Sequence, residues 1–168
     1  ITFTGSTAAG RRIAAICGDR IARCTLELGG KSPAIILDDY DLDKAAKSLS
    51  YSARALNGQV CSSLTRLIVS RDRHDDFVDA LAARFGKVKV GDPFDASSEM
   101  GPLASGRQRD RVESYIAKGR EEGARLVAGG GRPAHLDRGY FVEPTVFADV
   151  DNGSTIAREE IFGPVLSV

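Results

Sequence analysis

Apolar residues follow two periods that alternate along the chain. Apolar residues at every second position, or in short β-branched runs, predict strands, and apolar residues three or four positions apart predict helices. Strands are expected at residues 1–4, 24–28, 33–37 and 66–70, with an extended stretch at 139–147 and a last strand beginning within 163–168. Helices are expected at residues 7–17, 42–56, 73–85 and 108–122. This alternation predicts an α/β fold with parallel strand pairing.

Polar residues and glycines mark where these elements begin and where the chain turns. Ser6 and Asp41 each precede a helical pattern, and both are good N-caps because their side-chain oxygens accept from free backbone N–H groups. The segments "GDPFD" and "MGPL" predict turns. The glycine run at 129–131 resembles a phosphate cradle, but Pro133 follows and no helix begins behind it. A surface turn is therefore predicted there.

The amino-acid composition of the chain limits the classes of binding partner that we expect. Lys plus Arg and Asp plus Glu are both 23, so the net charge is zero, and no basic stripe with interleaved aromatic residues is present. We therefore expect no nucleic-acid partner. No apolar run approaches the ~20 residues that span a bilayer, which predicts a soluble chain without a membrane partner. The chain lacks an initiator Met and begins and ends within predicted strands, so we interpret it as an internal piece of a longer protein.

Three cysteines, Cys17, Cys24 and Cys61, are odd in number and form neither a CxxC motif nor a cluster with histidine. A reducing compartment, taken here as the cytoplasm, and no metal site are the expectations. Cys61 differs from the other two because it lies in the small polar segment "NGQVCSS" rather than among apolar residues. Most lone cysteines are buried and inert, yet this one is the best candidate nucleophile in the chain.

Three further segments each allow a plain and a functional interpretation. In "TLEL", Glu27 points away from the face that the two leucines share, toward either water or a site. "GSTAAGRR" has the glycine spacing of a P-loop without its Lys and Ser or Thr, which leaves Ser6 as an ordinary N-cap or as a phosphate contact at a helix N-terminus. "EEIFGPV" by itself predicts a helix that ends at Gly163-Pro164 with Phe162 in the core.

Taken together, the segments favour the functional interpretation. The order "FTGST", "LELGGKSP", "GQVC", "GDPFD", "GPL", "EEIFGPV" resembles the aldehyde dehydrogenase superfamily from residue 1 to residue 168. The most specific similarity is the spacing between Glu27 and Cys61, 61 − 27 = 34 residues, which matches the family's catalytic glutamate and cysteine.

The resemblance implies a role for each of these two residues. Cys61 would attack an aldehyde carbonyl to form a thiohemiacetal, and hydride transfer to NAD or NADP would leave a thioester. Glu27 would activate the water that hydrolyses this thioester. The backbone N–H of Cys61 would form half of the oxyanion hole.

The resemblance also implies cofactor contacts. Gly5 and Ser6 correspond to the pyrophosphate contact at a helix N-terminus, and Leu28 would lie near the nicotinamide. Glu160 corresponds to the carboxylate that accepts from the nicotinamide ribose, and Phe162 to the ring that packs beside it.

The sequence departs from the family pattern at two places. Many members carry an acid soon after "GST", where this chain has Ala8 and Ala9. Many also place an Asn two residues before the glycine of "GQxC", where this chain has Leu56, with Asn57 next to the glycine. The second departure leaves the hydrogen bonding of this loop open.

The implied architecture is a fragment of the aldehyde dehydrogenase fold. Residues 1–28 would be the C-terminal part of a Rossmann-like nucleotide-binding domain, and residues 29–168 most of an α/β catalytic domain. The full-length enzyme would be a homo-oligomer, dimer or tetramer, with a small-molecule aldehyde as substrate, and the isolated fragment is expected to be inactive. A CoA-acylating enzyme and a non-catalytic relative with a structural or binding role are the alternatives.

Overall fold

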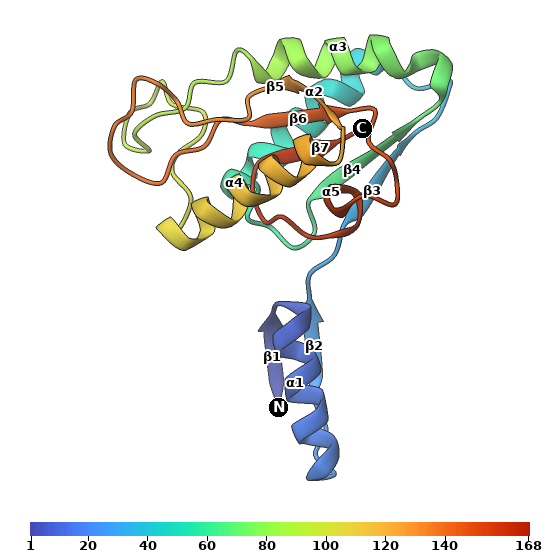
Figure 1. The fold of residues 1–168 in the computed structure, drawn as a ribbon, viewed down its shortest axis with the longest axis vertical. Coiled ribbons are helices and arrows are strands. Elements are labelled where there is room, and N and C mark those ends of the chain that lie inside the picture. Colours follow the sequence, from blue (N-terminus) through green and yellow to red (C-terminus); the bar gives the residue numbers. More distant parts are fainter. The chain divides into compact units, whose positions relative to one another are not determined.

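The computed structural model describes residues 1–168 as two compact units, Ile1–Gly30 and Lys31–Val168, whose elements are labelled in Figure 1. The sequence prediction placed a boundary after Leu28. The assignment of the two parts to a nucleotide-binding and a catalytic domain stays a prediction. No helix in the chain has both the length and the apolar character needed to cross a membrane.

The first unit consists of two parallel strands and one helix. Strands β1 (Thr2–Gly5) and β2 (Thr25–Leu28) pair, and α1 (Thr7–Asp19) connects them. The predicted cap is confirmed, since the Ser6 side chain accepts from the backbone N–H of Ala9 at 3.3 Å. The helix runs two residues past the predicted end at Cys17.

The second unit contains a five-stranded sheet in the order β3-β4-β7-β6-β5. Its strands are β3 (Ser32–Ile36), β4 (Leu64–Val69), β5 (Arg125–Ala128), β6 (Thr145–Ala148) and β7 (Val165–Ser167). The predicted parallel pairing holds for β3 with β4, β4 with β7 and β6 with β7, whereas β5 is antiparallel to β6. Strand β5 was not predicted, because only a short apolar run precedes the glycines that end it.

Four α-helices belong to this unit: α2 (Leu42–Arg54), α3 (His74–Phe85), α4 (Gly106–Glu121) and α5 (Thr155–Arg158). Short 3-10 helices occupy Ala55–Gly58 and Arg71–Arg73. Asp41 caps α2 as predicted, its carboxylate accepting from the N–H of Lys44 at 2.8 Å.

Two predicted boundaries were wrong for a backbone reason. The helix expected at 42–56 ends at Arg54, because Leu56 and Asn57 adopt left-handed φ angles of 47° and 57° that a right-handed helix cannot contain. The extended stretch expected at 139–147 forms a strand only over β6, and the residues before it form turns and coil.

Two groups of buried side chains form the core of the second unit. One group joins α2 and α3 to the sheet and includes Phe77, Leu81 and Leu166. The other joins α4 and α5 to the sheet and includes Val112 and Phe147. The second group also includes Ile161, which lies between the predicted site residues Glu160 and Phe162.

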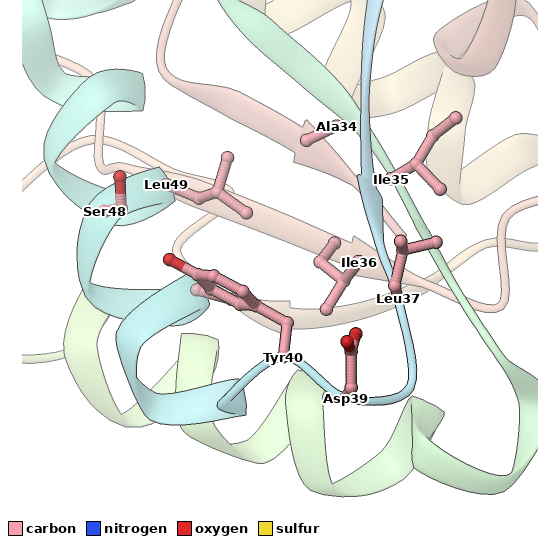
Figure 2. Close-up of a pocket in the computed structure, with 9 residues that line it drawn as sticks. Ala34, Ile35, Ile36, Leu37, Asp39, Tyr40, Ser48 and Leu49 are labelled. Atoms are coloured by element: carbon pink, nitrogen blue, oxygen red, sulfur yellow. The ribbon is translucent and has the colours of Figure 1, made fainter.

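A small pocket lies between β3 and α2 (Figure 2). It has a volume of about 290 Å³ and is lined mainly by apolar side chains, among them Ile36 and Leu49, with Tyr40 and Asp39 near its edge. None of the predicted site residues lines this pocket. It therefore belongs to the framework of the fold rather than to the candidate site.

Candidate active site

Glu27 occupies the position in β2 that the alternating pattern predicted. Its side chain is exposed, whereas Leu26 and Leu28 on either side are half-buried. The carboxylate thus lies on the face of the strand opposite the leucines. Its partner in the ladder is Thr4.

Three predicted cofactor residues lie together at the carboxyl ends of β1 and β2. Gly5 pairs with Leu28 in the parallel register, and Ser6 follows directly as the cap of α1. The first turn of α1 contains no acidic side chain, so the positive end of the helix dipole is not neutralised there. This electrostatic setting fits a phosphate group.

The helix α1 can lie close to β2 because Gly10 is a glycine. A β-carbon on Gly10 would lie 2.6 and 2.7 Å from the two methyl carbons of Leu28. The glycine therefore fixes the distance between the helix and the strand that bears Glu27.

Cys61 lies in an exposed turn between the 3-10 helix and β4. The turn is closed by a hydrogen bond from the N–H of Ser63 to the carbonyl of Val60 at 3.1 Å. Cys17, by contrast, is buried in α1, and Cys24 is half-buried. Cys61 is thus the only fully exposed thiol of the three.

Two side chains brace the loop before Cys61 against the segment 101–104. Asn57 donates to the carbonyl of Pro102 at 2.7 Å and accepts from the N–H of Gly101 at 3.1 Å. Gln59 accepts from the N–H of Ala104 at 3.1 Å. The sequence analysis left the bonding of this loop open, and the structure shows that Asn57 and Gln59 provide it.

The loop of Cys61 touches the "EEIFGPV" segment through two glycines. Gly58 has a φ of 72°, and a β-carbon there would overlap the carbonyl group of Gly163. The structure therefore brings together the loops that carry Cys61, Glu160 and Phe162.

The plain interpretation of "EEIFGPV" was wrong in its details. The helix α5 ends at Arg158, and Glu159 is already extended. Phe162 is 37% exposed and has a left-handed φ of 62°, whereas Ile161 is the residue that enters the core. Glu160 is half-buried.

Lys31 was missed by the sequence analysis, although it stands inside the quoted "LELGGKSP". Its side chain is buried, and its Nζ has no hydrogen-bond partner in the chain. Burial, and after it the positive charge of Arg66, lower the pKa of Lys31 to about 8, although the negative charge of Glu160 opposes the change. A lysine in the same short segment as the predicted base was the available signal.

A wider groove lies beside the bracing contacts. Its volume is about 840 Å³, and it is lined by residues that include Tyr51, Arg54, Leu56, Asn57, Met100 and Leu103. No group of three or more His, Cys, Asp or Glu side chains is placed to hold a metal ion.

Comparison with known proteins assigns this α/β protein to an enzyme family. The pattern described as "Aldehyde dehydrogenase family" matches residues 1–168, and the chain belongs to that family. The betaine aldehyde dehydrogenase of Brucella ovis is 51% identical over 170 residues, which is 100% of this chain and 35% of that protein.

Solved structures give the same result. The aldehyde dehydrogenase of Mycobacterium tuberculosis, complexed with NAD+, has a TM-score of 0.95 and 54% identity over 99% of this chain and 34% of that one. Betaine aldehyde dehydrogenase from Staphylococcus aureus in complex with NAD+ has a TM-score of 0.95 and 40% identity over 99% and 34% of the two chains. The chain therefore spans about a third of the length of its relatives.

Proposed function

We propose that the protein containing this chain is an NAD(P)-dependent aldehyde dehydrogenase that oxidises an aldehyde to a carboxylic acid. The observation that carries the proposal is the exposed Cys61 thiol on a loop that is braced by Asn57 and in contact with the segment of Glu160. The family membership and the NAD+ complexes of the structural relatives support the reaction and the cofactor.

Cys61 acts as the nucleophile in this proposal. The Cys61 thiol loses its proton to solvent, and the thiolate sulfur adds to the aldehyde carbon. The carbonyl electrons move to oxygen, where the backbone N–H of Cys61 donates to the developing negative charge. An oxidised nicotinamide cofactor, when bound, would supply the acceptor for the hydride, and loss of that hydride from the thiohemiacetal carbon would leave a thioester on Cys61. Glu27 then takes a proton from water, the water oxygen attacks the thioester carbon, and the carbon–sulfur bond breaks to release the acid and the thiolate.

Five residues would contact the cofactor in this proposal. Gly5 and Ser6 contact its pyrophosphate at the N-terminus of α1, where the unneutralised helix dipole favours negative charge. Leu28 would pack near the nicotinamide, the Glu160 carboxylate would accept from the ribose hydroxyls, and Phe162 would pack beside the ring. The proposed cofactor is NAD or NADP. We further propose that the full-length protein is a homo-oligomer and that it is cytoplasmic.

Glu27 separates this function from the CoA-acylating alternative. A thiol acceptor does not need a base to activate water, so a carboxylate at this position favours hydrolysis. The presence of both Cys61 and Glu27 also argues against a non-catalytic relative.

The test is Cys61→Ser in the full-length protein, assayed with NAD+, NADP+ and a panel of aldehydes. A serine hydroxyl has a far higher pKa than a thiol, so turnover should be abolished. Cys24→Ser is the matched control and should retain wild-type turnover. Retention of more than about a tenth of kcat by Cys61→Ser, a loss below ~1.4 kcal/mol in barrier, would contradict the proposal.

A further inference from the structure

Helix α4 runs alongside the segment from Thr155 to Phe162 and holds it at four successive points. At the C-terminal end of α4, Glu122 accepts from the N–H and the hydroxyl of Thr155, at 2.8 and 2.6 Å. At its N-terminal end, Gln108 donates to the carbonyls of Phe162, at 2.7 Å, and Ile161, at 3.3 Å. The helix therefore supports this segment from one end to the other.

In the middle of α4, two stacked side chains, Tyr115 and Arg111, contact the same segment. The Tyr115 hydroxyl donates to Oε2 of Glu159 at 2.7 Å. Arg111 donates to the Tyr115 oxygen at 3.1 Å and to the carbonyl of Glu160 at 2.7 Å, and its guanidinium lies 4.8 Å from the centroid of the Tyr115 ring. Burial and the bond to the Glu159 carboxylate both raise the pKa of the Tyr115 hydroxyl, which keeps it a donor.

The segment from Thr155 to Phe162 contains little regular structure that would stabilise its conformation. Helix α5 is one turn long, Glu159 is extended with φ −106° and ψ 145°, and Phe162 has a φ of 62°. A non-glycine residue in the left-handed region persists only where its surroundings impose that conformation. The donors from α4 provide such surroundings, because each fixes one group of the backbone or of Glu159.

We propose that Tyr115 is a positioning residue of the enzyme. By anchoring Glu159 and supporting Arg111, its hydroxyl sets the backbone that presents Glu160 and Phe162 to the cofactor. The proposal rests on the proposed function, because it takes Glu160 and Phe162 as cofactor contacts. Tyr115 acts through this segment, so its removal should change how well the cofactor binds more than how fast the bound complex reacts.

The first test is Tyr115→Phe in the full-length protein, which removes only the hydroxyl and keeps the ring under Arg111. We expect KM for NAD+ or NADP+ to rise at least about threefold, with a smaller change in kcat. A merely structural role would lower the melting temperature and leave KM unchanged. Ser114→Ala is the matched control, since the Ser114 hydroxyl donates only to the carbonyl of Arg111 within the same helix.

The second test measures the coupling between Tyr115 and Glu159. Glu159→Ala should raise KM for the cofactor as Tyr115→Phe does. The double variant should raise KM no more than the larger single effect, because both substitutions break the same hydrogen bond between Tyr115 and Glu159. Full additivity, or an unchanged KM in a folded Tyr115→Phe enzyme, would overturn the proposal.

Direct cofactor binding separates this proposal from the proposed function. Calorimetric titration with NAD+ and NADP+ reports the affinity without any turnover. If the wild-type protein binds a cofactor but oxidises no aldehyde, the proposed function fails, while weaker binding by Tyr115→Phe still supports the positioning role. If binding by Tyr115→Phe equals that of the wild type, the positioning role fails although the enzyme stands.

Discussion

Gly58 lies so close to the carbonyl group of Gly163 that no space remains for a β-carbon on Gly58. On the far side, a β-carbon on Gly163 would overlap the side chain of Val112 in α4. The loop of Cys61, the segment of Glu160 and helix α4 are thus packed in sequence, with a glycine at each point of contact. The position of the proposed nucleophile depends on these close approaches.

Gly58→Ala should therefore damage both stability and activity. The substitution places a β-carbon at a φ of 72° and against the Gly163 carbonyl, so the loop must move away from its bracing contacts. We expect the free energy of unfolding to fall by about 2 kcal/mol or more, and kcat to fall at least about tenfold. Chemical denaturation and steady-state kinetics on the full-length protein measure the two effects.

The control for this substitution is Gly123→Ala. Gly123 also has a left-handed φ, 87°, but a β-carbon there would meet nothing within 4 Å. In the Gly123→Ala variant the free energy of unfolding should fall by about 1 kcal/mol, because only the conformational preference of glycine is lost, and kcat should be unchanged. Equal losses of stability and of kcat in the two variants would show that the contact with Gly163 has no role.

The three thiols should differ in reactivity. A reactive cysteine needs both access and thiolate character. Cys61 is exposed, whereas burial raises the pKa of the Cys17 thiol and a hydrogen bond with Cys24 raises it further. Iodoacetamide should therefore label Cys61 first and Cys17 last in the native protein, as followed by peptide mass mapping over time. Labelling of Cys17 as fast as Cys61 would show that Cys61 has no special accessibility.

Local signals were enough to predict most of the fold. The caps Ser6 and Asp41 were found because a side-chain oxygen before an apolar helical pattern acts within one turn. The exposed Glu27 followed from the two-residue period of a strand. These features depend on neighbours in sequence, which a single chain displays directly.

Features that depend on distant residues were missed. The end of α2 was placed too late because the left-handed Leu56 and Asn57 are stabilised by bonds from Asn57 to residues more than forty positions away, 101 − 57 = 44. The pattern of "EEIFGPV" taken alone predicted Phe162 in the core, because nothing local shows that Gln108 donates to its carbonyl or that Phe162 is 37% exposed. The contacts of Glu122, Tyr115 and Arg111 along α4 are equally invisible in the sequence pattern.

Glu27→Gln tests the proposed base. The amide keeps the size of the side chain but cannot accept a proton, so hydride transfer should continue while thioester hydrolysis slows. We expect a pre-steady-state burst of reduced cofactor followed by a slower steady rate. Rapid-quench mass spectrometry should find the acyl group on Cys61.

The control is Asp19→Asn, an exposed acid at the end of α1, which should show wild-type kinetics. Absence of both the burst and the acyl-enzyme in Glu27→Gln would assign Glu27 an earlier step, such as activation of Cys61, or a structural role.

Lys31 should make stability depend on pH in the alkaline range. Its pKa in the folded protein is about 8, below the ordinary value of 10.5. Below pH 8 the lysine is charged in both states, and the folded state bears the full cost of the buried charge. Between about pH 8 and 10.5 the folded protein releases the proton while the unfolded chain keeps it, so this contribution makes stability rise with pH across that window.

Replacing the lysine isolates this contribution. Lys31→Met keeps much of the volume of the side chain and removes the charge, so it should stabilise the full-length protein at pH 7, by at most about 3 kcal/mol. The advantage over the wild type should shrink as the pH rises from 7.5 to 9.5, because the wild-type lysine becomes neutral. Lys44→Met, at an exposed position of α2, is the control and should show no such trend. Melting temperatures of the three proteins across this range provide the measurement, and a Lys31→Met advantage that stays constant or grows with pH would show that Lys31 remains charged in the fold.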